Sequence, residues 1–336
     1  MAANRNVVLK SRPSAAVSTD NFEIVDAPIP TPGEGELLVR NLYLSLDPGI
    51  RLLLGSDDGY IPPVAVGTPM GTGVLGTVIE SRAPGFAAGD LVVGRGTVGE
   101  YSVVGTGAMC WKVDPSLCPT PSAALSVLGM TGLPAYFGLL DIGKPKPGET
   151  VLVSAAAGAV GSIVGQIAKI KGCRAVGIAG GAEKCRRLIE EFGFDAAVDY
   201  KGKDSAQLSA AIKEACPDGV DIYFDNVGGT VLDAALLQMN WQGRVPVCGM
   251  ISGYDGGNAP QMHNLFLIVA KVLHVQGFLS FTYEDRFQEA IAELSGWIAE
   301  GRIKYRDEVF EGLEQAIPTF MRLFDGSNQG KTMVKL

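Results

Sequence analysis

A regular alternation of strand and helix patterns over residues 150–279 constrains the fold of this chain more than any other feature. Short apolar runs such as TVLV, AVGIA and DIYF are each followed by a segment with helical periodicity, and Gly172 and Gly193 end two of these segments. Strands that alternate with helices of this length form a parallel sheet with helices packed on its faces. We therefore predict an α/β fold with a doubly wound parallel sheet.

The first hundred residues show a different pattern. Apolar runs with period-two alternation, such as GTGVLGTVIES and GDLVVGRG, are separated by Gly and Pro, which is typical of a compact β-rich unit. The last segment, GKTMVKL, has the pattern of a strand with no parallel neighbour nearby in sequence, so we expect it to return to this unit. A chain of 336 residues is long enough for two domains. We predict a β-rich domain over residues 1–125, completed by 300–336, and an α/β domain over 126–299.

Charge, apolar runs and cysteines narrow the class of protein. The formal net charge is -8 at pH 7 and no run of Lys or Arg occurs, which argues against nucleic acid or an anionic membrane as partner. Two charge-free stretches, 115–140 and 150–168, reach membrane-spanning length, but both contain glycines and the first also contains prolines, so we expect buried core. Six cysteines without a C-x-x-C pair, and no secretory signal, indicate free thiols in a cytoplasmic protein.

Metal-dependent and hydrolytic chemistry lack the residues that they need. Catalytic zinc takes three protein ligands from His, Cys, Asp or Glu. The chain has only two histidines, His263 and His274, and its cysteines show no ligand spacing, so we predict no metal site. A G-x-S-x-G turn between a strand and a helix, which would indicate Ser-His-Asp hydrolysis, is also missing from the sequence.

One turn of small residues carries the strongest functional signal. The segment VLVSAAAGAVGSIVGQIAKIKG runs from a buried strand through this turn into a helix. In the dinucleotide-binding fingerprint G-x-G-x-x-G, the glycines allow a tight turn, close approach of the pyrophosphate and close packing of the helix. Ala156, Gly158 and Gly161 occupy these three places. The helix from Ala159 would direct its amide donors at the phosphates. A glycine-rich turn that only serves packing is the alternative, and the strand-turn-helix order disfavours it.

The next strand distinguishes between the two nicotinamide cofactors. An NAD site usually has Asp or Glu ~20 residues past the first glycine, where it binds the ribose 2′-hydroxyl. This strand instead ends in GIAGGAEK, with small residues, Gly180 among them, where the acid would stand. Lys184 follows, and Tyr200 closes the strand after that. Lys184 alone could be a solvated residue in the first turn of a helix. The missing acid favours the 2′-phosphate of NADP.

The whole pattern resembles one family. The chain is similar to the zinc-independent medium-chain dehydrogenase/reductases, in the branch of prostaglandin reductases, alkenal double-bond reductases and curcumin reductase. The similar segments are NLYLSLDP, LGMTGLPAYFGLLDIGKPKPGETVLVSAAAGAVGSIVGQIAKIKGC, EKCRRLIEEFGFDAAVDYK, YFDNVGG, GRVPVCGMISGY and GSNQGKTMVKL. They span nearly the whole chain in the family's order. The resemblance implies a GroES-like domain made from the start and the tail, a Rossmann domain between them, and a homodimer.

The resemblance also implies which residues surround the cofactor. These are Met130 and Thr131 by the nicotinamide; Ala156, Gly158, Ala159 and Val160 by the pyrophosphate; Gly180, Lys184 and Tyr200 at the adenosine 2′-phosphate end; Asn226, Cys248, Gly249, Ile251, Ser252, Phe278 and Leu279 along the inner face; and Asn328 from the tail.

The implied reaction is the NADPH-dependent reduction of the C=C bond of an α,β-unsaturated aldehyde or ketone, such as a 2-alkenal, an enone, or a prostaglandin- or curcumin-like molecule. Hydride goes to the β-carbon, and a donor aimed at the carbonyl oxygen stabilises the charge that develops there. Tyr254 matches the family tyrosine implicated in catalysis, and Tyr60 is a second candidate for the pocket wall. Each of the two could instead be a packed loop residue.

Gly49 marks a departure from the family pattern. In the segment LDPGIR it replaces an aromatic residue that borders the substrate pocket, which implies a wider or differently shaped pocket. Two other functions therefore stay open. One is an NADPH quinone reductase, and the other is an NADPH-binding protein with little turnover.

Overall fold

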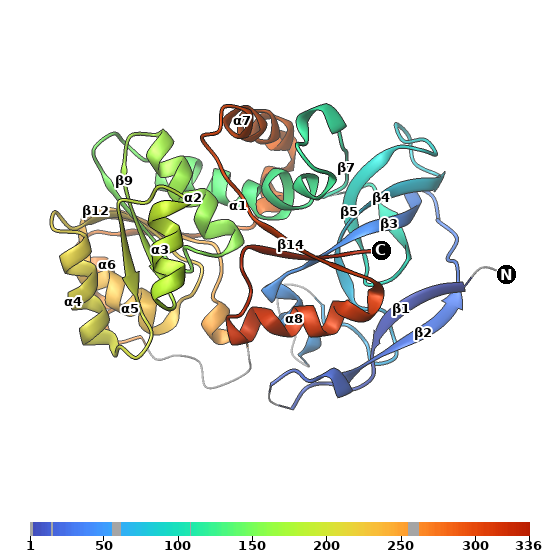
Figure 1. Ribbon diagram of the computed structural model, residues 1–336, viewed down its shortest axis with the longest axis horizontal. Coiled ribbons are helices and arrows are strands. Elements are labelled where there is room, and N and C mark those ends of the chain that lie inside the picture. The colour runs from blue at the N-terminus through green and yellow to red at the C-terminus, as the bar shows by residue number, and fades with distance from the viewer. Residues whose placement is uncertain (1–2, 15, 56–61, 108, 255–261) are drawn as a thin grey trace. The chain divides into compact units, whose positions relative to one another are not determined.

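The chain divides into two compact units. The computed structural model describes residues 3–14, 16–55, 62–107, 109–254 and 262–336, and Figure 1 labels its elements. The first unit comprises Met1–Met130, Tyr254–Gly256 and Asp307–Leu336. The second comprises Thr131–Gly253 and Gly257–Arg306. That these units are independent domains with the predicted boundaries remains a prediction.

The second unit is built on a six-stranded sheet in which every pair of neighbouring strands is parallel. Across the sheet the strands follow the order β10-β9-β8-β11-β12-β13. Their bounds are β8 Thr150–Val153, β9 Arg174–Ala179, β10 Ala196–Asp199, β11 Val220–Phe224, β12 Met239–Val247 and β13 His274–Gly277. The doubly wound sheet predicted from the alternation of strands and helices is confirmed.

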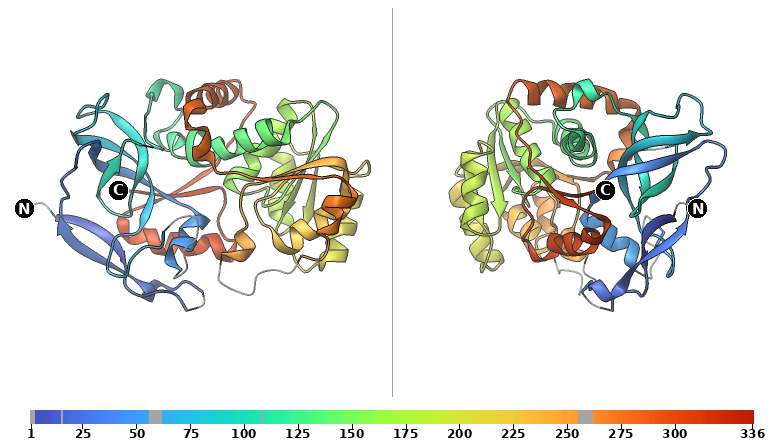
Figure 2. Two further views of the ribbon diagram at one scale, coloured as in Figure 1. Left: turned by 180° about the vertical axis from the view of Figure 1, so that it is seen from behind. Right: turned by 45° about the vertical axis from the view of Figure 1, so that its right-hand side comes forward.

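Helices cover both faces of this sheet, as Figures 1 and 2 show. Their bounds are α1 Gly132–Phe137, α2 Ala159–Ile170, α3 Ala182–Glu190, α4 Ser205–Ala215, α5 Gly229–Gln238, α6 Phe266–Ala270 and α7 Phe287–Ala299. Successive side chains of a strand point to opposite faces. On one face Val176 joins a hydrophobic cluster with residues of α4 and α5, and on the other face Gly177 lies against Leu188 of α3. Burial on both faces explains why the central strands β8, β9 and β11 are mainly apolar.

Helices α2 and α3 end where the sequence predicts, but three helical patterns in the sequence, over 230–240, 263–272 and 287–304, are longer than the helices that form, and the last of them ends at Ala299 as α7. Gly172 and Gly193 follow α2 and α3 with φ of 79° and 71°, a backbone conformation that glycine adopts without strain. The helix predicted over 230–240 ends instead at Gln238, because residues from Met239 onward already belong to β12. The helix predicted over 263–272 is shorter too, since α6 spans only Phe266–Ala270.

The first unit is β-rich, as predicted. A seven-stranded sheet follows the order β14-β15-β3-β4-β5-β7, with β6 paired to β3, and β1 and β2 form a separate two-stranded sheet. The bounds are β1 Ala3–Leu9, β2 Phe22–Pro28, β3 Glu36–Leu46, β4 Gly71–Ser81, β5 Leu91–Thr97, β6 Tyr101–Gly105, β7 Trp111–Lys112, β14 Asp307–Glu311 and β15 Lys331–Lys335.

The last strand returns to the β-rich unit, but the reason differs from the predicted one. Strand β15 pairs antiparallel with β3, which confirms its predicted destination. It also pairs in parallel with β14, its neighbour in sequence across helix α8 (Ala316–Asp325). The expectation that this strand lacks a parallel partner nearby in sequence was therefore wrong. Strand β14, helix α8 and strand β15 form a strand-helix-strand unit, the connection by which consecutive strands pair in parallel.

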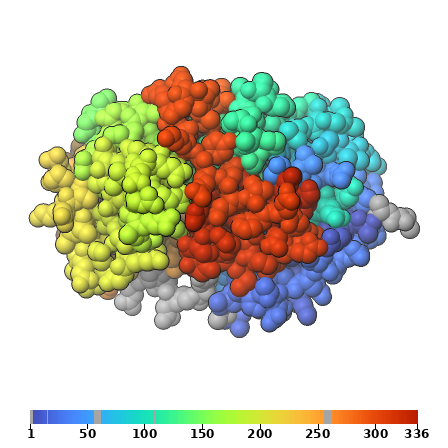
Figure 3. All heavy atoms as spheres, in the orientation of Figure 1, coloured from blue at the N-terminus to red at the C-terminus, as the bar shows by residue number. Residues whose placement is uncertain are grey.

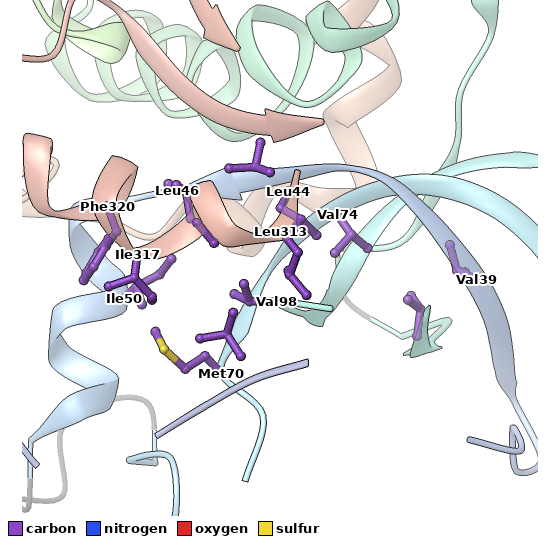
Figure 4. Close-up of a cluster of buried hydrophobic side chains, with 14 of the residues drawn as sticks. Val39, Leu44, Leu46, Ile50, Met70, Val74, Val98, Leu313, Ile317 and Phe320 are labelled. Atoms are coloured by element: carbon purple, nitrogen blue, oxygen red, sulfur yellow. The ribbon is translucent and has the colours of Figure 1, made fainter. Parts of the chain in front are cut away.

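Helix α8 closes the hydrophobic core of the first unit. Figure 4 shows Ile317 and Phe320 of α8 beside Leu46 of β3 and Ile50, all of them buried. Ile50 belongs to a short 3-10 segment, Pro48–Leu54, so this packing also holds the backbone around Gly49. Helix α8 lies at the surface in Figure 3, and its residues Pro318 and Asp325 are exposed.

One helical stretch among the described residues is long and apolar enough to cross a membrane. It spans Pro121–Gly143, and 89% of its most apolar window is buried inside the structure. The prediction of buried core is confirmed for most of residues 122–140 and 150–168, whereas residues 115–121 are exposed or half-buried.

Candidate active site

The strand order reverses its winding direction at the place where the sequence predicts the cofactor. From β8 the chain winds outward to β9 and β10, and then returns to the other side of β8 to form β11, β12 and β13. In open parallel sheets ligands bind at the carboxyl ends of the strands where the winding direction reverses. In this sheet that point lies between β8 and β11, which are neighbours in parallel register.

The glycine turn follows β8 at this point. Ala156 lies against β9, since its N–H donates to the carbonyl of Ile178 in that strand at 3.0 Å. A Cβ on Gly161 would lie 2.5 Å from the carbonyl oxygen of Ala155 and 2.8 Å from Cα of Ala156, so only glycine lets α2 start this close to the turn. Among the described atoms, only the carbonyl oxygen of Ala155 lies within 4 Å of a Cβ built on Gly158, at a distance of 3.0 Å. The second glycine thus faces open space, where a pyrophosphate would approach.

The start of α2 leaves its amide donors available. Gly158 is the N-cap residue, and in this fully described segment no side chain caps the helix and no acid stands in its first turn. Ala159 and Val160 are half-buried here. Free N–H groups and the positive end of the helix dipole favour an anion at this position.

The ends of β9 and β10 come together at a second location. Gly180 follows β9, and a Cβ built on it would lie 3.1 Å from the ring and hydroxyl of Tyr200 and 3.2 Å from Cε of Lys201. The side chains of Tyr200 and Lys201 therefore cover Gly180, where an NAD site would carry its acid. Lys184 lies nearby in sequence, half-buried in the first turn of α3.

Asp199, the last residue of β10, holds this corner in shape. Its carboxylate accepts hydrogen bonds from the N–H groups of Gly181 at 2.8 Å and Lys201 at 3.0 Å. Burial acts to raise the pKa of Asp199, but these hydrogen bonds and the charges of Lys203 and Lys201 outweigh it and hold that pKa below its usual value. The carboxylate is thus ionised at neutral pH and committed to the backbone.

The inner-face residues meet at the carboxyl ends of β11 and β12. Asn226 follows β11, and its Nδ2 donates to the carbonyl of Ser154 at 2.8 Å. The segment after β12 docks onto the same place: the N–H of Ile251 donates to the carbonyl of Asn226 at 3.3 Å, and the hydroxyl of Ser252 donates to the carbonyl of Val227 at 2.6 Å. The predicted residues Asn226, Ile251 and Ser252 are therefore brought together.

Cys248 and Phe278 follow the ends of β12 and β13. The desolvation of the Cys248 thiol and the nearby carboxylate of Asp225 raise the pKa of that thiol to about 12, so it stays protonated at neutral pH. Phe278 packs edge-to-face on Phe224 of β11, with ring centroids 6.3 Å apart. Gly249 and Leu279, next in sequence to these two, lie at the same edge of the sheet.

Four predicted residues belong to the first unit: Gly49, Met130, Tyr254 and Asn328. Tyr254 is half-buried and follows the 3-10 turn Ile251–Gly253. Met130 is next to Thr131, a buried residue of the second unit. The approach of these four residues to the cofactor remains a prediction. Tyr60 lies outside the described residues.

Three residues of this edge were missed in the sequence: Ser154, Lys201 and Asp225. Ser154 and Asp225 are completely buried, and polar residues are rarely buried without a purpose. A signal was available, because both directly follow buried strands of a parallel sheet. Lys201 directly follows Tyr200 and could have been included with it.

Two family models match the chain. The model described as the N-terminal domain of oxidoreductase matches residues 5–113, and the model described as zinc-binding dehydrogenase matches residues 159–296. An NADPH-dependent curcumin reductase from Escherichia coli (strain K12) is 44% identical to this chain, over 99% of the chain and 97% of that protein. A 2-alkenal reductase (NADP(+)-dependent) from Nicotiana tabacum is 40% identical, over 99% of the chain and 97% of that protein.

The chain belongs to the medium-chain dehydrogenase/reductases, in the branch of the prostaglandin, alkenal and curcumin reductases. A solved structure supports the membership. CurA from Vibrio vulnificus in complex with NADPH matches this medium-chain reductase with a TM-score of 0.89 and 41% identity, over 98% of each chain.

The zinc named in one family description has no counterpart among the described residues. No three His, Cys, Asp or Glu side chains in the part of the chain that the structure covers are grouped so that they could hold a metal ion. Within the described residues, the donors therefore do not form the set of three ligands that a catalytic zinc takes.

Proposed function

We propose that this medium-chain reductase uses NADPH to reduce the C=C bond of α,β-unsaturated aldehydes and ketones. The observation that carries the proposal is full-length similarity, at 40–44% identity, to reductases named for curcumin and for 2-alkenals. Both kinds of named substrate contain a C=C bond conjugated to a carbonyl group, so the proposed substrate class is the chemistry that they share.

The second unit supports NADPH as the cofactor. Gly158 leaves room beside the uncapped start of α2, which suits a pyrophosphate. Glycine rather than an acid directly follows β9, and Gly180, Tyr200 and Lys201 meet there, which suits the 2′-phosphate rather than a free 2′-hydroxyl. We assign the 2′-phosphate to Lys184, Tyr200 and Lys201. When bound, NADPH supplies the hydride for the β-carbon of the substrate.

The chain has to stabilise charge on the substrate. Addition of hydride to the β-carbon leaves a negative charge on the carbonyl oxygen, and a positioned O–H donor stabilises that charge most effectively. In the proposal the phenol of Tyr254 donates to this oxygen, and the proton that completes the product reaches the α-carbon from Tyr254 or from water. The docking of Ile251 and Ser252 onto the end of β11 supports this role, because it fixes the segment that leads to Tyr254.

The first experiment follows NADPH absorbance with a panel of acceptors. The panel contains a medium-chain 2-alkenal, an alkenone, a 15-keto prostanoid, curcumin and a benzoquinone, and each is repeated with NADH. Oxidation of NADPH by the enals and enones, with NADH much slower, is expected. A strong preference for the quinone would instead make the protein a quinone reductase. No oxidation with any acceptor, despite tight binding of NADPH, would make it a binding protein.

A Tyr254→Phe variant tests the proposed proton donor. Removal of one donor to a developing oxyanion typically lowers kcat by a factor on the order of 10². We expect such a loss of kcat with an unchanged dissociation constant for NADPH, measured by the fluorescence of the bound nicotinamide. Wild-type kcat in this variant would remove Tyr254 from the mechanism.

The protein is also proposed to form a homodimer through the edge of the parallel sheet. Strand β13 pairs with β12 on one side, and all four of its residues are exposed. Apolar side chains surround it: Phe266 and Val269 of α6 are 74% and 70% exposed, and Trp241 is 66% exposed. An exposed edge strand with apolar neighbours is a template for pairing with a second chain.

A Val275→Lys variant tests this interface. A charge on an edge strand prevents strand pairing, so a monomer is expected by light scattering where the wild-type protein is a dimer. Val309→Lys, on edge strand β14 of the other sheet, is the matched control, because Val309 is 39% exposed and Val275 is 41% exposed, and it should leave the dimer intact. A monomeric wild-type protein at micromolar concentration would contradict the proposal. The cytoplasm is the proposed compartment, which the six free cysteines support.

A further inference from the structure

Asp225 is a buried carboxylate directly before Asn226, at the point where the winding of the sheet reverses. It follows β11 and is completely shielded from solvent. Four groups donate to its Oδ1: the hydroxyl of Tyr223 at 2.8 Å, the hydroxyl of Ser154 at 3.0 Å, and the N–H groups of Val227 and Gly228, both at 3.0 Å. The N–H of Gly228 also donates to Oδ2, at 3.1 Å. A buried carboxylate is costly, and donors on every side are needed to hold it.

We infer that Asp225 is a positioning residue for the bound cofactor, because it holds Asn226 and the backbone after β12 in place through Ser154 and through its own main chain. The inference rests on the proposed function, since it takes the cofactor to lie at this edge of the sheet. Asp225 itself is enclosed and is assigned no contact with the cofactor or substrate.

The first connection runs through Ser154. The hydroxyl of Ser154 has one proton to donate and two lone pairs. It donates to Asp225 at 3.0 Å, and it accepts the N–H of Asn226 at 2.9 Å. The carbonyl of the same serine accepts Nδ2 of Asn226 at 2.8 Å. Both the backbone and the side chain of Asn226 are therefore fixed to Ser154, whose own hydroxyl is oriented by Asp225.

The second connection runs through the main chain of Asp225. Its N–H donates to the carbonyl of Pro246 at 2.9 Å. Its carbonyl accepts the N–H of Cys248 at 2.8 Å and of Gly249 at 3.2 Å. Asp225 thus sets the end of β12 against the end of β11, and with it the start of the segment that carries Ile251 and Ser252.

The surroundings require a carboxylate rather than an amide. All four neighbours of Asp225 are donors, and only a carboxylate accepts with both oxygens. In an Asp225→Asn variant the new NH₂ group would face the N–H of Gly228 at the place of Oδ2, or all four donors at the place of Oδ1. The variant keeps the size of the side chain, so it changes hydrogen bonding with little change in packing.

Three variants separate positioning from stability: Ser154→Ala, Asp225→Asn and Tyr223→Phe. Ser154→Ala cuts the connection between Asp225 and Asn226. Tyr223→Phe is the matched control, because it removes a hydrogen bond from the same carboxylate at the same depth without touching Asn226. The readouts are the dissociation constant for NADPH, the single-turnover rate of hydride transfer at saturating NADPH with a 2-alkenal, and the melting temperature.

We expect Ser154→Ala and Asp225→Asn to slow hydride transfer by roughly tenfold or more, since small displacements of bound reactants cost rate, while Tyr223→Phe stays within about twofold. Wild-type rates in both Ser154→Ala and Asp225→Asn would overturn the inference. An equal loss in Tyr223→Phe would overturn it too, because the carboxylate would then act only on the fold.

The design also distinguishes this inference from the proposed reaction. If none of the acceptors in the panel supports oxidation of NADPH by the wild-type protein, the proposed reaction is wrong. The dissociation constant for NADPH then becomes the test. Weaker binding by Ser154→Ala and Asp225→Asn, with unchanged binding by Tyr223→Phe, would then support the positioning role. Equal binding by all variants would refute it.

Discussion

Gly180 shows how a missing side chain can select a cofactor. Where an NAD enzyme carries an acid, this chain has a glycine covered by Tyr200 and the stem of Lys201. The Asp199 carboxylate is close by, yet it accepts hydrogen bonds from Gly181 and Lys201 and is not offered to a ribose. In the proposed site, positive charge supplied to the 2′-phosphate discriminates between the two cofactors.

The lysines at this corner give the first prediction. A hydrogen bond to a charged group contributes about 1.5–3 kcal/mol, so removing one should cost about tenfold or more in affinity. We expect Lys184→Ala and Lys201→Ala each to raise the KM for NADPH by about that factor and to leave the KM for NADH unchanged. Lys203→Ala is the control and should have little effect. A parallel loss with both cofactors would show that the lysines act on the fold instead.

A second prediction concerns the pocket and Gly49. No described atom lies within 4 Å of a Cβ built on Gly49, so the larger side chain of the family can be restored without a clash there. We expect Gly49→Tyr to keep the melting temperature and to lower kcat/KM for curcumin about tenfold relative to a short 2-alkenal, the range that steric exclusion from a pocket gives. Gly105→Tyr, also at an open position, is the control. An unchanged ratio for Gly49→Tyr would place this residue away from the substrate.

At the scale of the element, the start of α2 depends on close packing. Ala155 before it has φ of 47°, a left-handed conformation that is unfavourable for alanine. Such strain is found at functional turns that the surroundings hold in place. Here the parallel neighbours of β8 and the packing of Gly161 provide that support.

Gly161→Ala tests this element. The new methyl group would collide with backbone atoms of Ala155 and Ala156, which cannot move cheaply. We expect a loss of about 1–3 kcal/mol in the free energy of unfolding, as for other overpacked sites, and weaker binding of NADPH. Gly296→Ala, exposed inside α7 with no atom within 4 Å, should instead stabilise the protein by about 0.5–1 kcal/mol. Chemical denaturation of both variants measures the contrast.

At the scale of the whole molecule, the thiols have a common property. Burial raises the pKa of Cys110, Cys173 and Cys216 to about 11, and burial together with Asp225 raises that of Cys248 to about 12. The thiol pKa values of Cys118 and Cys185 are raised as well. Since only the thiolate attacks electrophiles, a reductase of enones keeps its own cysteines from reacting with its substrates.

This property gives a prediction with two measurements. At neutral pH the folded protein should be alkylated slowly by iodoacetamide or a 2-alkenal, and all six thiols should react after unfolding, as counted by mass spectrometry. Stability should also depend on pH. Above pH 9.0, the ordinary thiol value, the unfolded chain loses protons that the folded protein keeps, so the free energy of unfolding falls as pH rises. Rapid alkylation of any cysteine in the folded protein would contradict the expectation.

The amino-acid sequence by itself determined the parallel sheet, the glycine turn and the β-rich first unit. These features depend on local patterns: continuous apolar runs, helical periodicity, and the spacing of small residues within a single turn. The start of β12 was decided by its pairing with β11, and the parallel pairing of β15 with β14 was decided by the strand order of the sheet. For the same reason, residues such as Ser154 and Asp225 acquired a role only in the tertiary structure. Their hydrogen bonds join strands that are 70 residues apart, and no local pattern records which buried polar groups will meet.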